Sequence, residues 1–186
     1  MLVEAEVAEA LRNRGIEVAS IFVASCSERM VQVFSGLQGG EDSRDADLDC
    51  AISLVESLWD PDASLEVFSR AASALEEFPE MQPTETGLTG IVEVYSFYAV
   101  LTMRYAALCR ANGDVESALK CAHACLTAMG QLDQNLPTPS FFAEEAELQR
   151  QIALSGIGEP FDRGCMRAVD VRVSAGRLVA LRGRMG

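Results

Sequence analysis

Cys121, His123 and Cys125 are the residues whose types and spacing first suggest a metal site. Thiolates and imidazoles are the ligands that Zn²⁺ prefers, and a structural zinc site needs four of them. On a helix, Cys121 and Cys125 share one face, while His123 points about 160° away from their mean direction. His123 is the sole histidine, and no second pair of cysteines completes the set. The sequence therefore predicts buried thiols and a surface histidine, with no metal and no cofactor.

One acidic run has the spacing of an EF-hand calcium loop. The acids that would occupy positions 1, 3, 5 and 12 of such a loop are Asp45, Asp47, Asp49 and Glu56. Cys50 stands where the sharp turn of the loop requires glycine. A helical stripe of apolar residues also crosses this run, and a continuous helix would keep Asp45 far from Glu56. We interpret the run as the acidic N-terminus of a helix, where negative charge is favourable.

Glu28 and Arg29 interrupt an otherwise apolar helical pattern. Adjacent helical residues point about 100° apart, so these two pair poorly with each other. One of them is expected to enter the bundle and bond to Glu93 or Arg104, which lie three turns apart on one face of a later helix. A buried polar tie or a solvated face is the commoner role of such residues. If Glu28, Glu93 and Arg104 converge instead, they form the one weak ligand-binding site that we would assign.

Three tyrosines, Tyr95, Tyr98 and Tyr105, form a stripe on that same later helix. Core packing with the hydroxyl groups at the rim is the expected role, and the alternative is a ligand or partner groove in which Tyr95 and Tyr98 bind. His123 is the sole histidine that could serve as the base of a catalytic Ser–His or Cys–His pair. The sequence also lacks the glycine-rich phosphate-binding motifs and the nucleophile elbow. We therefore expect no catalytic residues and no enzyme activity.

The charge of the chain narrows its partners. The 186 residues include 28 acidic and 15 basic residues, a formal net charge of −13. Such an excess of acid excludes nucleic-acid binding through a basic surface, and no apolar run reaches the roughly 18 residues of a membrane span. Residues 1–160 carry −17 and residues 161–186 carry +4. We expect no nucleic-acid or membrane partner, a basic protein as the candidate partner, and leave homo-oligomerisation open.

Apolar residues recur every three or four positions through most of the chain, which predicts helices. The expected helices span about residues 2–14, 17–37, 45–59, 61–78, 88–111, 115–129 and 139–154. The helix at 88–111 is apolar on nearly every side and is predicted to be central. Gly15, Asp60 with Pro61, and Asp114 mark helix ends or caps. The sequence predicts an all-α, single-domain helical bundle of six or seven helices.

The last part of the chain has a weaker pattern. We assign residues 1–160 to the bundle and residues 161–186 to a basic C-terminal segment, a short helix followed by an irregular, extended tail. Val169, Val171 and Val173 alternate as in a strand, which favours the extended interpretation. A basic segment on an acidic body is expected either to fold back onto it or to differ from it in exposure.

Residues 22–30 read Phe-Val-Ala-Ser-Cys-Ser-Glu-Arg-Met. This run is similar to the Phe-x-Ala-Cys-x-Cys-Glu-Arg-Met pattern of the YjaG-like family, a bacterial family of uncharacterised helical proteins. Residues 52–58 resemble the next helix of the family, and the resemblance covers roughly two thirds of the chain. Ser25 and Ser27 stand where the family has cysteines, and Gln32 where it has proline. The resemblance implies an all-helical fold, no established activity and no catalytic residues.

Three functions remain in view. The first is a non-enzymatic acidic protein-interaction module, of which small immunity proteins that neutralise toxins are one class. The second is a small-molecule-binding bundle that uses the tyrosine-lined groove, and the third is an enzyme. The N-terminal residues do not form a signal peptide, so we expect a cytoplasmic protein whose six cysteines stay reduced.

Overall fold

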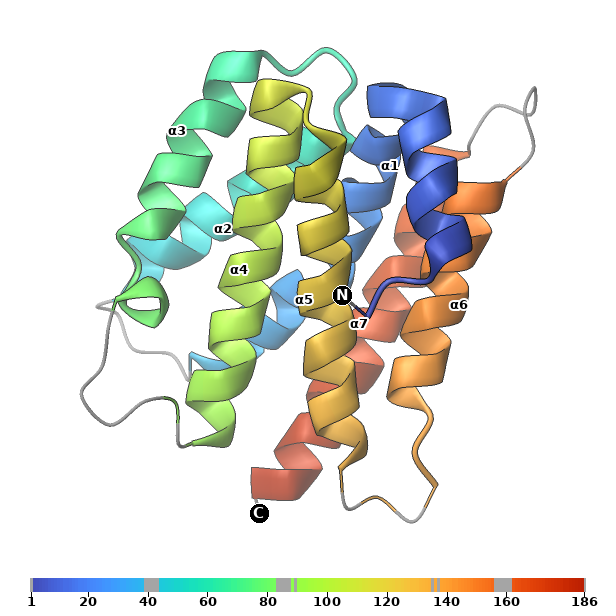
Figure 1. Ribbon diagram of the computed structural model, residues 1–186. Helices are drawn as coiled ribbons and strands as arrows, with labels where there is room; N and C mark the ends of the chain where they lie inside the picture. Colours follow the sequence, from blue (N-terminus) through green and yellow to red (C-terminus); the bar gives the residue numbers. More distant parts are fainter. Residues whose placement is uncertain are drawn as a thin grey trace.

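The computed structural model describes residues 2–38, 44–82, 88, 90–134, 136, 138–155 and 162–185. Over these residues the protein is an all-α bundle without strands, which confirms the predicted fold class (Figure 1). The elements in chain order are α1 (Ala5–Leu37), α2 (Asp45–Trp59), α3 (Leu65–Glu76), the 3-10 turn η2 (Pro79–Met81), α4 (Ile91–Asn112), α5 (Val115–Asp133), α6 (Phe141–Leu154) and α7 (Arg163–Met185). None of the described helices is long and apolar enough to cross a membrane.

The first two predicted helices join into α1, which is sharply kinked at Gly15. Gly15 has φ 71° and ψ −161°, a conformation that is open essentially to glycine alone. Beyond the kink every residue from 21 to 31 is buried, because α1 contacts α2, α4, α5, α6 and α7. The prediction that the helix at 88–111 is central was therefore wrong. Past its first turn α4 keeps a half-buried stripe that includes Val94, Leu101 and Leu108, whereas small residues such as Ala24 and Ser25 let helices approach α1 from all sides.

The acidic run at the start of α2 forms ordinary helix. The helix is continuous from Asp45 to Trp59, and eleven residues of helix separate Asp45 and Glu56 by about 16 Å. This confirms the interpretation as an acidic helix N-terminus. The predicted cap of the next helix was wrong: α3 begins at Leu65, and Asp60 ends α2 and accepts a hydrogen bond from the Asp62 N–H.

Two aspartates organise the two ends of α5. Asp114 accepts hydrogen bonds from the N–H groups of Glu116 and Ser117, as the sequence predicts for a helix N-cap. Asp133, in the last turn of α5, accepts from the backbone N–H groups of residues 140–142 at 2.8–2.9 Å. The last turn of α5 thereby positions the first turn of α6.

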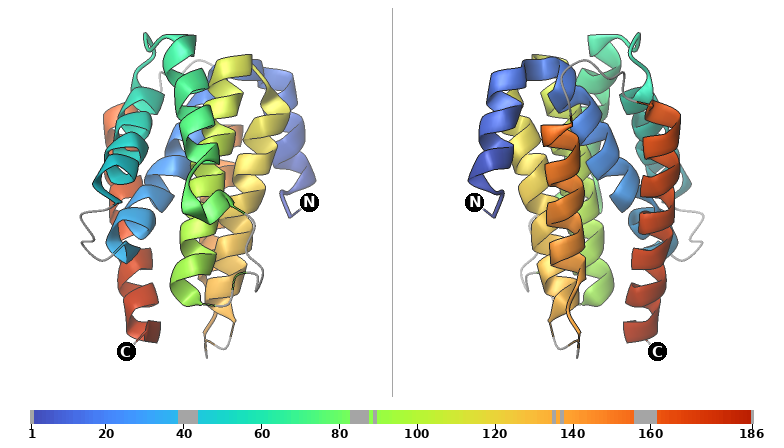
Figure 2. Two further views of the ribbon diagram at one scale, coloured as in Figure 1. Left: turned by 90° about the vertical axis from the view of Figure 1, so that its left-hand side faces the viewer. Right: turned by 90° about the vertical axis from the view of Figure 1, so that its right-hand side faces the viewer.

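The C-terminal segment is a helix, and the predicted extended tail was wrong. α7 continues to Met185 and packs along α1 (Figure 2, right). Its buried residues recur at helical spacing: Asp170, Ser174, Arg177 and Leu181. Three of these four are polar, so the apolar pattern conceals the helical period. The basic segment thus folds back onto the acidic body, and α7 belongs to the bundle.

Candidate functional site

The most distinctive arrangement in the core is a group of charged and polar side chains that join three helices. α1 contributes Ser25 and Arg29, α6 contributes Glu145 and Gln149, and α7 contributes Asp170 and Arg177. All six are buried, with exposed fractions of 2% or less. We call these six residues the buried charge cluster.

Glu145 is the centre of the buried charge cluster. Arg29 donates two hydrogen bonds to its carboxylate, from Nε to Oε2 at 2.9 Å and from Nη2 to Oε1 at 2.8 Å. Arg177 Nη2 donates to Oε2 at 2.6 Å, and Gln149 Nε2 donates to Oε1 at 2.7 Å. Both oxygens therefore have two donors each.

Asp170 closes the other side of the cluster. Its Oδ1 lies 2.8 Å from Arg29 Nη1, and its Oδ2 accepts a hydrogen bond from Ser25 Oγ at 2.6 Å. Ser25 and Arg29 are four residues apart, so one turn of α1 presents both to α7. Two arginines and two carboxylates leave the cluster formally neutral, as the burial of charge requires.

The electrostatics of Glu145 follow from this geometry. Burial alone would raise its pKa, but the positive charges of Arg29 and Arg177 and their hydrogen bonds outweigh burial and lower the pKa to about 2. Glu145 is thus an anion with no lone pair free to accept a substrate proton. The cluster can hold α6 and α7 on α1, and Glu145 itself is not placed to act as a general base.

Glu28, which precedes Arg29 on α1, forms a second buried polar contact between helices. Its Oε2 accepts hydrogen bonds from Trp59 Nε1 and from Arg167 Nε, both at 2.8 Å, and Arg167 also pairs with Glu56. Glu28 and Arg29 therefore both bond to α7, through Arg167 and Asp170. They differ in the second helix that they reach, which is α2 for Glu28 and α6 for Arg29. The commoner role, a buried polar tie, is confirmed for both residues.

The expected bond from Glu28 or Arg29 to Glu93 or Arg104 is not among the contacts of the described residues, and the alternative convergence of Glu28, Glu93 and Arg104 is not seen either. Arg104 pairs with Glu76 of α3 at 3.0 Å, and the Glu93 carboxylate accepts a hydrogen bond from the Gly90 N–H at the start of α4. Glu93 acts at the N-terminus of α4, whereas Arg104, three turns further along, reaches α3, which packs against this helix.

The two tyrosines offered as ligand-binding residues do not line the same cavity in the part of the chain that the structure describes. Tyr95 is buried, which raises its pKa to about 12, and it lines a cavity of about 140 Å³ with Val94 and Arg184. Tyr98 is half-buried and its ring lies edge-on to Phe97, with 5.3 Å between ring centroids. Packing therefore accounts for both rings.

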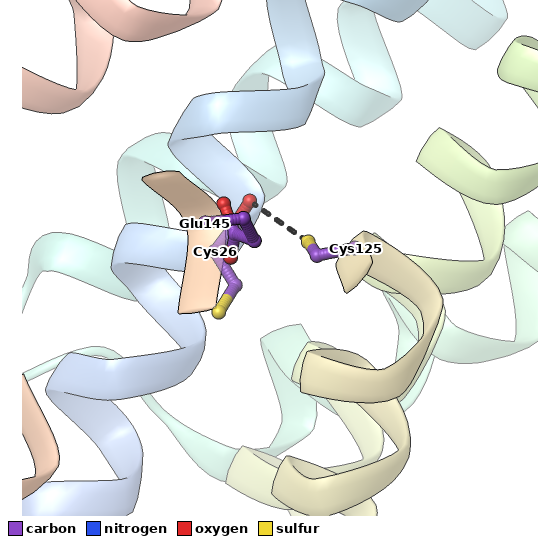
Figure 3. Close-up of side chains that lie close together, drawn as sticks. All are labelled: Cys26, Cys125 and Glu145. Atoms are coloured by element: carbon purple, nitrogen blue, oxygen red, sulfur yellow. Dashed lines mark hydrogen bonds between the residues drawn. The ribbon is translucent and has the colours of Figure 1, made fainter. Parts of the chain in front are cut away.

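The cysteines of α1 and α5 form a buried thiol group near Glu145 (Figure 3). Ligand atoms of Cys26, Cys125 and Glu145 lie within 4.8 Å of one another, as a metal site would require. Burial raises the pKa of both thiols well above the usual value, and the Glu145 oxygens already accept four hydrogen bonds. We therefore assign no metal to these residues. His123 points elsewhere, with its Nδ1 accepting a hydrogen bond from the Leu2 N–H.

Sequence reasoning identified Arg29 but missed the residues that surround it. Glu145 and Gln149 on α6 are spaced by four, and Asp170, Ser174 and Arg177 on α7 are spaced by four and three. A polar stripe at helical spacing is the signal that was present. It does not distinguish a buried polar face from a solvated one, because the same residue types are usual on the surface.

Comparison with known proteins gives no further guidance. No family model, no curated protein and no solved structure matches the chain. The resemblance to the YjaG-like family therefore stays a prediction, and function has to be argued from the side chains themselves.

Proposed function

We propose that the protein is a non-enzymatic binding module whose acidic surface receives a basic protein partner. The observation that carries this proposal is that most arginines already contact carboxylates or backbone carbonyls of the same chain. Most of them are engaged within the bundle, so the charge left facing outward is predominantly negative.

The engaged arginines fall into two groups. One group pairs with carboxylates: Arg12, Arg29, Arg44, Arg104, Arg150, Arg167 and Arg177. The other donates to backbone carbonyls: Arg14, Arg110, Arg163, Arg182 and Arg184. Arg70 and Arg172 are exposed and have no hydrogen-bonding partner among the described residues.

The candidate docking surface is the acidic face, which we define as Glu4, Glu6, Glu144 and Glu147. The first turns of α1 run beside α6 (Figure 2, right), and all four side chains are exposed. Three of these acids raise the pKa of Arg150. Glu147 has the largest effect, through a hydrogen bond and its charge, and the charges of Glu6 and Glu4 add to it. An acidic surface of this kind steers association with a basic one.

Affinity capture from cell lysate with a matched pair of variants tests the proposal. The first variant neutralises the acidic face with Glu4→Gln, Glu6→Gln, Glu144→Gln and Glu147→Gln. The control removes four exposed acids near α2 and α3, with Asp49→Asn, Asp62→Asn, Glu66→Gln and Glu77→Gln. We expect the wild type and the control to retain one basic protein that the acidic-face variant loses.

Salt provides the second criterion. At about 0.5 M salt the Debye length falls to about 4 Å, so the captured protein should elute. Equal capture by both variants, or the absence of any salt-sensitive basic protein, would contradict the proposal. We also propose a cytoplasmic location, which is supported by six cysteines that form no disulfide.

A further inference from the structure

A cavity of about 290 Å³ opens where the end of α2 meets α1, α4 and α7. Its apolar lining includes residues Ile21, Leu58 and Trp59, and its polar lining includes Arg110 and Arg163. The volume is close to the lower end, about 300 Å³, of pockets that hold small molecules. An apolar wall with a few convergent polar groups is the usual composition of such pockets.

The two guanidinium groups in this cavity contact backbone carbonyls but no carboxylate within ion-pair distance among the described residues. Arg110 donates to the carbonyls of Leu58 and Asp60 at 3.0 and 3.4 Å, and Arg163 donates to that of Trp59 at 3.1 Å. Each guanidinium has further N–H donors. Burial is the main cause that lowers the pKa of Arg110; the nearby charge of Arg163 lowers it as well, while Cys109 and Asp60 oppose the shift. The two cations therefore repel each other, and Asp60 offsets only part of that repulsion.

Capping the C-terminus of α2 does not account for two arginines. At the end of α5, Arg184 alone donates to the carbonyls of Gln131, Leu132 and Gln134. That single side chain supplies as many hydrogen bonds as Arg110 and Arg163 supply together. The second cation at α2 is therefore more than helix capping needs, and its repulsion is relieved when an anion lies between the two.

We propose that this cavity binds a small organic carboxylate, with the carboxylate between Arg110 and Arg163 and the apolar body against Trp59. Guanidinium groups suit this task because their paired N–H groups match the two oxygens of a carboxylate. Glu17 also lines the cavity, and its negative charge disfavours a phosphate dianion more than a carboxylate monoanion. The site is independent of the acidic face, which lies on other turns of α1 and on α6.

The fluorescence of Trp59 reports on this cavity directly, because Trp59 is the sole tryptophan of the chain. We would titrate the intact protein with benzoate, with its neutral counterpart benzamide and with inorganic phosphate, exciting tryptophan selectively. We expect benzoate to change the emission with a millimolar dissociation constant, as befits a fragment-sized ligand. Benzamide and phosphate should bind at least about tenfold more weakly, because they lack either the charge or the planar monoanion.

Three variants localise the binding. Arg163→Gln should weaken benzoate binding about tenfold or more, and Arg163→Lys should restore only part of it, since lysine keeps the charge but not the planar fork. Arg172→Gln is the matched control, because it removes the same charge from an exposed position on the same helix. It should leave the affinity within about twofold of wild type, as expected for a distant screened charge.

Several outcomes would overturn the proposal. One is the absence of an emission change up to about 100 mM benzoate, well above the expected dissociation constant. A second is equal binding of benzamide, which would indicate an apolar site without anion recognition. A third is an equal loss of affinity in Arg163→Gln and Arg172→Gln, which would indicate attraction by net charge alone. Tighter binding of phosphate than of benzoate would contradict the assigned ligand class.

Discussion

Arg29 and Arg177 in the buried charge cluster, and Arg110 and Arg163 in the cavity at the end of α2, are the same chemical group in opposite surroundings. The first pair shares the carboxylate of Glu145 and is almost fully buried. The second pair is half-buried and donates only to backbone carbonyls. The first pair has its counter-charge within the chain, so it holds the structure together. Among the described residues the second pair has acidic neighbours, Glu17 and Asp60, but no carboxylate within ion-pair distance, which leaves room for a ligand.

The largest expected effect comes from Glu145→Gln. The substitution keeps the shape of the side chain but leaves Arg29 and Arg177 buried with less than their counter-charge, which should lower the free energy of unfolding by about 3–5 kcal/mol. Urea unfolding followed by circular dichroism measures the change. Glu147→Gln, two residues along the same helix at an exposed ion pair, should change it by at most about 1 kcal/mol. Similar values for the two variants would contradict a special role for the cluster.

Acid should weaken the cluster selectively. Glu145 titrates at about 2 in the folded protein against 4.5 as its ordinary value, so its contribution is fully present above pH 4.5 and is lost as the pH falls toward 2. The depressed pKa corresponds to about 3 kcal/mol. The difference in unfolding free energy between wild type and Glu145→Gln should therefore narrow across this range. A difference that stays constant with pH would show that Glu145 does not carry the effect.

A smaller effect is expected from Arg167→Gln. Arg167 is one of two donors to the buried carboxylate of Glu28, and Trp59 Nε1 remains as the other. Losing one charge-assisted bond together with the exposed pair to Glu56 should lower the unfolding free energy by about 1–2 kcal/mol. Arg172→Gln on the same helix serves as the reference, and equal stability of the two variants would refute the assignment.

The smallest effect on stability is expected from Arg163→Gln. The variant loses a single hydrogen bond to the Trp59 carbonyl, which is worth about 0.5–1 kcal/mol. Thermal unfolding of the variant and the wild type measures it. A loss as large as that of Glu145→Gln would show that both arginine pairs are structural, and the contrast between them would disappear.

The parts of the fold that the sequence predicted correctly depend on short-range signals. The break at Gly15, the span of α2 and the cap at Asp114 each depend on residues within a turn or two, so the sequence reveals them. The start of α3 was missed because Asp60 and Pro61 carry a cap signature that the chain uses to end α2 instead. The helix α7 was missed because its inward face is polar.

The candidate site depended on contacts that no local pattern specifies. The burial of Glu28 and Arg29 was one of the alternatives that the sequence allowed. Their partners were not foreseeable, since the bonds from Arg29 to Glu145 and Asp170 join residues 116 and 141 positions apart. Arg104 was assigned to the same site because its positive charge could pair with Glu28, but in the folded protein it pairs with Glu76.

The amino-acid sequence by itself determined the all-α class, most of the helices and the acidic balance of the chain, because helical period, capping residues and charge are properties of short segments. The tertiary structure alone decided which charges meet. An arginine has the same local signature whether it faces two carboxylates in the core or lines a cavity beside Trp59. The packing of α6 and α7 against α1 decides which arginines lose their water and gain a counter-charge, and so which of them stabilise the core.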